Sequence, residues 1–288
     1  MSTRASAGVV TKSTEGLPWA LWMRQVVAIL RLEVRKNFWG RRAILIYLLA
    51  LLPLLIFSAI ALVPPDVDGR GEPAFLNMMF ANIFEILILR TVVFFGCAWI
   101  FMNLFRGEVV DRSLHYYFLS PVRREVLVIG KYLSGLLTSL ILFVSSTLVS
   151  LLLLYLPLGY SASTKLLFEG HGFKYALTYL AITTLACAGY GAVFLLIGLL
   201  FRNPIIPALA VYGWEFINFL LPPLLKKLSV IHYLQSLMPL PLSEGPFAVV
   251  AEPTPAWVSV PALLIMTGLV LAFASLQIRW MEIRYGGE

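Results

Sequence analysis

The chain has 288 residues, of which 60% are hydrophobic and 13% are charged, and its mean hydropathy is +0.87. A soluble domain of this length carries about 25% charged residues, so the composition excludes a large aqueous domain and is typical of a polytopic membrane protein. The net charge of +7 is therefore interpreted from where the cations lie relative to the membrane, and no nucleic-acid partner is expected.

The first two segments of the chain differ sharply in character. Residues 1–17 are polar and small, which predicts a disordered N-terminus. Residues 18–40 alternate with helical period: apolar residues recur every fourth position, and arginines lie opposite them, although Glu33 interrupts the apolar side. The apolar positions are Trp22, Val26, Leu30, Val34 and Phe38, and the arginines are Arg24, Arg31 and Arg35. We expect an interfacial amphipathic helix on an anionic leaflet; the alternative is a helix packed on a cytoplasmic domain.

Six apolar runs, each near the roughly 20 residues that a bilayer requires, predict a transmembrane domain over residues 41–281 and a C-terminal tail over 282–288. The spans are expected at 43–63, 81–104, 132–156, 175–201, 204–224 and 258–278. With the N-terminus inside, the inner segments hold 16 of the 22 Lys and Arg residues and the outer loops hold five. This bias predicts cytoplasmic N- and C-termini. We expect the membrane to be a plasma membrane, namely a bacterial inner membrane.

The last outer loop, residues 225–257, is rich in proline but has apolar pairs at helical spacing, Ile231/Leu234 and Leu234/Met238. A fully solvated loop has no need of such pairs. We expect one or two short helices at the outer leaflet, packed at the mouth of a pathway, because re-entrant backbone is tolerated only where protein or a wet cavity covers it.

Three ionisable residues lie within the predicted spans: Glu85, Arg90 and Glu215. Such residues are expensive in hydrocarbon and indicate function by default. From the helical rise, Arg90 and Glu215 lie about 22 Å and about 18 Å from the inner ends of their spans. We therefore hypothesise that they form an ion pair between spans two and five, within one protomer or across a dimer, with Glu85 nearer the outer headgroups. The pair either fixes helix register or lines a pathway for a polar substrate.

Small and hydroxyl residues form stripes on spans three and four, which are more typical of close helix contacts than of a pore lining. These residues are Gly135, Ser139, Ser146, Ser150, Thr184, Gly191 and Gly198. Catalytic motifs are missing from the sequence. The three histidines have no metal-ligand spacing, and Gly130-Lys131 lacks the upstream glycine of a phosphate loop. We expect no metal, no ATP site and no enzymatic activity in this chain.

Residues 106–131 form a charged island between spans two and three, and their cations place it in the cytoplasm. The pattern predicts a short helix, a break at Ser120-Pro121, and a helix that restarts at Arg123-Arg124-Glu125 and continues into span three. Such an element could transmit motion from a soluble partner, whose groove would accept its aromatic residues. The alternative is an ordinary amphipathic loop on the inner leaflet.

At this island the chain resembles the permease subunits of ABC-2 type exporters. The shared features are an acidic residue (Glu108), Arg112-Ser113-Leu114, Leu119-Ser120-Pro121, a basic pair and Gly130-Lys131, together with the interfacial helix, six spans and outer helical excursion. The resemblance implies that 107–121 is a coupling helix for an ABC ATPase. The implied coupling residues are Glu108, Asp111, Arg112, Leu114, Tyr117, Phe118, Pro121, Arg123 and Arg124.

The resemblance further implies a dimer with a second permease protomer, identical or different, in which the pathway is lined partly by spans two and five. ATP and Mg would bind to the partner ATPase and no cofactor to this chain. The alternatives are an ion-coupled secondary transporter, which favours internal repeats and broken mid-membrane helices, and a membrane enzyme. Family substrates range from lipids to ions, and the sequence does not choose among them.

Overall fold

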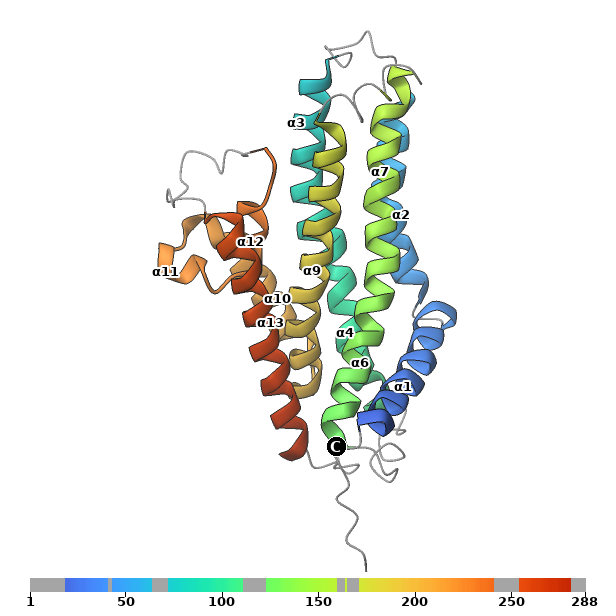
Figure 1. Cartoon of the computed structure of the whole chain (residues 1–288), viewed down its shortest axis with the longest axis vertical. Helices are drawn as coiled ribbons and strands as arrows, with labels where there is room; N and C mark the ends of the chain where they lie inside the picture. Colours follow the sequence, from blue (N-terminus) through green and yellow to red (C-terminus); the bar gives the residue numbers. More distant parts are fainter. Residues whose placement is uncertain are drawn as a thin grey trace, which may run out of the picture.

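The computed structural model describes residues 19–40, 43–63, 72–110, 123–159, 164, 171–240 and 254–280, and every regular element among them is helical. Long helices run side by side along the long axis of the molecule (Figure 1). Five helices within these ranges are long and apolar enough to cross a membrane: Ala43–Ala61, Ala74–Gly107, Arg124–Leu158, Gly172–Leu200 and Ala256–Trp280. The chain is thus an all-α, multi-pass membrane protein. The predicted N-terminus and C-terminal tail lie outside the described residues.

Helix α1 (Trp19–Trp39) lies obliquely at the base of the bundle, beside the start of the third span (Figure 1). Its buried positions are Ile29 and Glu33, on the side that faces that span. One side of the predicted amphipathic helix is therefore covered by the bundle itself. Helix α2 (Ala43–Ala61) begins four residues after α1 ends and runs along the bundle as the first span.

The second span is longer than the sequence suggested. It comprises α3 (Pro73–Ile83), the π-helix η1 (Phe84–Val93) and α4 (Phe94–Val110), whereas a loop was expected up to residue 80. Pro73 suits the first helical position, where its missing N–H and fixed φ cost nothing. Leu76 and Phe80 are then buried against neighbouring helices, which stabilises the extra turns.

The third span is one continuous helix built from α6 (Arg124–Ser139), η2 (Leu140–Val144), α7 (Ser145–Tyr155) and η3 (Leu156–Leu158). Its start agrees with the restart predicted at residues 123–125. At the helical rise of about 1.5 Å per residue, the 35 residues of Arg124–Leu158 measure about 52 Å, well beyond the ~30 Å bilayer core. The fourth span, α9 (Gly172–Leu200), ends before Pro204.

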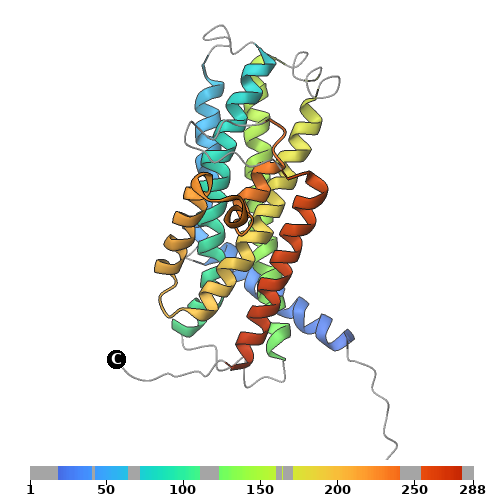
Figure 2. The same ribbon diagram turned by 90° about the vertical axis from the view of Figure 1, so that its left-hand side faces the viewer.

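The fifth apolar segment is shorter than the expected 204–224. It comprises α10 (Ile205–Phe216) and η4 (Ile217–Leu220), and it ends where Pro222 and Pro223 remove consecutive backbone donors. The chain then turns back through α11 (Pro223–Lys226) and α12 (Val230–Ser236), which lie midway along the bundle (Figures 1 and 2). Short helices were expected here, and residues 241–253 of this loop lie outside the described ranges.

Helix α12 packs against α9 and α13 (Ala256–Gln277), the last long helix, which continues into η5 (Ile278–Trp280). Ile231 and Leu234 of α12 are fully buried. The predicted apolar pair therefore faces the bundle interior, and the turn-back after the fifth segment is an integral part of the fold.

The centre of the bundle depends on very close contact between α4 and α9. A Cβ atom on Gly198 would lie 2.8 Å from the Cα and O atoms of Met102, so only glycine fits there without moving the backbone. The ring of Phe101 occupies the space left by Gly135 and Gly191. The small residues that were expected to form helix contacts do so at these three positions.

Candidate functional site

The cytoplasmic junction between spans two and three was the main site predicted from sequence. Residues 111–122 lie outside the described ranges, so the structure does not place six of the predicted coupling residues: Asp111, Arg112, Leu114, Tyr117, Phe118 and Pro121. Glu108 belongs to the last turn of α4, although only its backbone is described. Arg123 and Arg124 are described, and both lie at the start of α6 in contact with other helices.

The first turn of α6 is bound to the end of the last span. The guanidinium of Arg124 donates from Nη1 to the carbonyl oxygens of Ile278 at 3.2 Å and Arg279 at 2.9 Å. A cation there satisfies carbonyl groups that the helix end leaves without partners. Arg279 in turn forms an ion pair with Glu125. The start of span three and the C-terminal end of the last long helix are therefore held together by reciprocal polar contacts.

The same helix is bound to α1 through a buried ion pair. The Lys131 ammonium lies 2.7 Å from Oε1 of Glu33, and the two side chains are 0% and 3% exposed. Nζ of Lys131 also donates to the Leu104 carbonyl of α4 at 2.8 Å and lies 5.3 Å from the centre of the Phe105 ring. One ammonium group thus links three helices.

A cation–π contact adds a second link to α1. The guanidinium carbon of Arg123 lies 4.8 Å from the centre of the Trp22 ring. We call Arg123, Arg124, Glu125 and Lys131 the α6 junction. Sequence reasoning missed the role of Glu33 in it. The only signal was the acidic residue on the otherwise apolar side of the amphipathic pattern, and its partner is 98 residues away along the chain.

The intramembrane polar residues form a second cluster, deep in the bundle. Arg90 pairs with Glu85: its Nη2 and Nε lie 3.1 Å and 3.3 Å from Oε1 of the carboxylate. The amide of Gln235, on α12, donates to the same oxygen at 2.6 Å. Glu85 is therefore bound within the protein, with a side chain 13% exposed, whereas the sequence led us to expect it nearer the outer headgroups.

The π-helical turn explains why Glu85 and Arg90 meet. Residues five apart lie about 140° from each other around an α-helix, so their side chains would diverge. In η1 the backbone hydrogen bonds run from i to i+5, which brings the fifth residue back over the first. Thr91 follows the same spacing, because its hydroxyl donates to the Ile86 carbonyl at 3.0 Å. Such π-helical segments are frequent at functional sites.

Glu215 binds a helix terminus instead of forming the predicted ion pair. Its carboxylate accepts the N–H groups of Val230 at 3.0 Å and Ile231 at 2.8 Å, at the start of α12, and also the Tyr190 hydroxyl at 3.2 Å. The first N–H groups of a helix have no partners within it, and a carboxylate is favoured there. The buried carboxyl group of Glu215 is thus bound by backbone donors.

The predicted Arg90–Glu215 ion pair is therefore wrong in its partners, although the two residues are neighbours. Arg90 Nη1 donates to the main-chain carbonyl of Glu215 at 3.1 Å, while its charge is balanced by Glu85. This contact lies within one protomer. The helical-rise estimate placed the two residues at a common depth, but it could not include the smaller turn per residue of a π-helix.

The polar side chains of the two clusters can bind a group and orient it, but among the described residues they include no evident set of catalytic groups. Within the described ranges, no group of three His, Cys, Asp or Glu residues could hold a metal ion. Cys97 and Cys187 are both free thiols buried in the core. The two clusters are the ion-paired junction at the start of α6 and the carboxylate–guanidinium cluster beside the turn-back of the fifth segment.

A scan of the sequence against protein-family models gave no match, and a search of curated proteins also gave none.

Proposed function

We propose that this chain is the membrane-spanning permease subunit of an ATP-driven ABC-2 type exporter. In this proposal the short helix Ile205–Leu220 acts as a sixth span, because the two termini would then both lie in the cytoplasm, as the distribution of Lys and Arg favours. The chain would associate with a second permease protomer in a bacterial inner membrane. ATP and Mg would bind to a separate ATPase subunit.

The observation that carries the proposal is the α6 junction. The charged island ends at a helix that contacts α1, α4 and η5 through Arg123, Arg124, Glu125 and Lys131. A displacement that reaches the start of α6 would therefore be passed to three other helices through these contacts. Coupling of a soluble motor to a membrane pathway requires this kind of rigid connection, because a change at one site matters only if it biases a second, distant element.

The test is whether an ABC ATPase copurifies with the full chain through residues 107–121. We expect the ATPase to be retained by the wild type and lost from the triple variant Leu114→Ala/Tyr117→Ala/Phe118→Ala. Phe173→Ala, which removes an exposed aromatic ring at the opposite end of the molecule, is the matched control and should retain the ATPase. Retention by all variants, or no ATPase on the wild type, would refute the proposal.

An ion-coupled carrier is the second candidate, because one specific observation favours it. The fifth segment is broken at Leu220–Pro223, and two carboxylates, Glu85 and Glu215, lie beside the break. Broken helices with coupling carboxylates are common in secondary transporters. Transport by the purified chain in proteoliposomes, driven by an ion gradient without any ATPase, would favour this candidate. Transport that requires the ATPase and ATP would favour the exporter.

A further inference from the structure

The outward side of α1 carries a stripe of uncompensated positive charge. Arg24, Arg31 and Arg35 are exposed and fall within about 40° of one another around the helix, opposite the buried Ile29 and Glu33. Within the described part of the chain none of the three arginines forms a hydrogen bond or ion pair. Glu33, the acidic residue of α1, forms its ion pair with Lys131 on the buried side of the helix, so the outward face has no anion of its own.

Large apolar side chains flank this stripe and are also exposed. Met23 and Val27 retain 65% and 51% of their accessible surface, and Trp19 and Trp39, at the two ends of the helix, retain 67% and 88%. A helix that combines exposed arginines with exposed aromatic and aliphatic residues is typical of the membrane interface. A soluble acidic partner would leave this apolar surface without a role, whereas a lipid satisfies both kinds of group.

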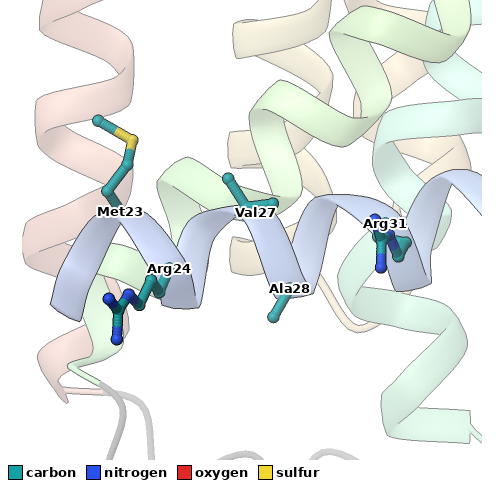
Figure 3. Close-up of a pocket in the computed structure, with 5 residues that line it drawn as sticks. All are labelled: Met23, Arg24, Val27, Ala28 and Arg31. Carbon is teal, nitrogen blue, oxygen red and sulfur yellow. The ribbon is translucent and has the colours of Figure 1, made fainter. Parts of the chain in front are cut away.

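The arginines and the apolar residues meet around a shallow hollow of about 330 Å³, lined by Met23, Arg24, Val27, Ala28 and Arg31. Figure 3 shows Met23 and Val27 pointing to the side along which the long helices continue, and Arg24 and Ala28 pointing to the opposite side. Arg24 and Arg31 are two helical turns apart, about 10 Å along the axis, and the small side chain of Ala28 lies between them.

We propose that this hollow binds the headgroup of an anionic phospholipid. The phosphate would lie over Ala28, where the guanidinium groups of Arg24 and Arg31 can donate to it from either side, and the acyl chains would follow Met23 and Val27 into the bilayer. Arginine binds phosphate oxygens in paired hydrogen bonds, and cations at the inner leaflet favour anionic lipid. The order of polar and apolar residues along the hollow matches the order of headgroup and acyl chain in a leaflet.

The site is distinct from general adsorption because it joins the α6 junction directly. Glu33 and Trp22, on the other side of the same helix, contact Lys131 and Arg123. A lipid bound at Arg24 and Arg31 would therefore hold α1 at a fixed depth while α1 holds the start of span three.

The experiment measures lipid retention by the purified full chain. Wild type and variants would be reconstituted in mixed vesicles of phosphatidylglycerol and phosphatidylcholine, extracted with detergent, and the retained lipids counted by native mass spectrometry. Each arginine near an anionic surface contributes roughly a 5-fold preference, so we expect Arg24→Gln/Arg31→Gln to lose about 25-fold of the selectivity for phosphatidylglycerol. Arg202→Gln, which removes an exposed arginine between α9 and α10, should leave the selectivity unchanged.

Ala28→Glu is the second variant. Its carboxylate lies one turn from each arginine, so it should stabilise α1 while repelling phosphate, and we expect the same loss of selectivity. Equal retention of both lipids by the wild type would overturn the proposal, as would selectivity that survives both variants. Displacement of the lipid by millimolar inorganic phosphate alone would show a free-phosphate site and would also overturn it. So would variants that lose a bound protein while their lipid retention stays unchanged.

Discussion

Removal of either partner of the Lys131–Glu33 pair should destabilise the whole chain. In Glu33→Leu the buried ammonium of Lys131 loses the carboxylate oxygen that lies 2.7 Å away in the wild type, and it retains the Leu104 carbonyl and the Phe105 ring. In Lys131→Met the carboxylate of Glu33 remains buried without its cation. Breaking a buried ion pair in this way costs about 3–5 kcal/mol of unfolding free energy.

The double variant Glu33→Leu/Lys131→Met tests whether the two charges act as a pair. Replacing both members of a buried ion pair by apolar residues of similar volume is often neutral. The double variant should therefore lose far less unfolding free energy than the two single variants lose together. At roughly 2–4 °C per kcal/mol, we expect each single variant to melt about 6–20 °C below the wild type, and the double variant to recover most of that loss.

The assay follows the two core cysteines during heating of the full chain in detergent. Cys97 and Cys187 are free and buried, so a thiol-reactive fluorogenic dye reports unfolding. Glu125→Leu is the control, because its ion pair with Arg279 is partly exposed and should contribute less than about 1 kcal/mol. Single variants that melt within about 2 °C of the wild type, or a double variant whose loss equals the sum of both, would refute the argument.

Three further changes probe the bundle. Gly198→Ala should lower the melting temperature by several degrees, because the new Cβ would lie 2.8 Å from the Met102 backbone; unchanged melting would show that α9 can move aside. The exchange Glu85→Arg/Arg90→Glu should recover more stability than either single change if these two residues form the ion pair, and urea unfolding of the purified chain would measure it. Glu215→Gln should cost about 1–2 kcal/mol, as for the loss of a helix cap, and hydrogen exchange should increase in α12 specifically; equal exchange would contradict the capping role.

The sequence predicted the α-helical membrane class and several span boundaries from apolar length alone. Helices α2, α9 and α13 begin and end within a few residues of the spans expected at 43–63, 175–201 and 258–278. The start of the second span was missed because Asn77 interrupts the apolar residues of α3 before the expected start at residue 81. Asn77 accepts the Tyr155 hydroxyl at 2.6 Å, a contact between segments 78 residues apart that no local pattern can indicate.

The polar sites were harder to predict, because their pairing depends on local backbone geometry and on distant contacts. Arg90, Glu85 and Glu215 were each recognised as unusual, but an α-helical frame assigned Arg90 the wrong ionic partner. Lys131 was interpreted as the residue immediately before span three, and Glu33 as an interruption of the apolar face of the predicted amphipathic helix. Together they are the most deeply buried ion pair among the described residues, which neither pattern reveals alone.

The π-helix η1 also makes the second span two helices that are out of phase. The side chains of α3 and those of α4 belong to different helical frames, and the ten residues of η1 provide the offset between them. A π-helical residue turns the chain by less than the 100° of an α-helical residue, so η1 changes which residues of α4 point toward the fourth helix. The contact of Phe101 with Gly191 depends on this offset, so the length of η1 helps to set which face of the span meets the fourth helix. In this region an insertion or deletion should be tolerated far less well than a substitution.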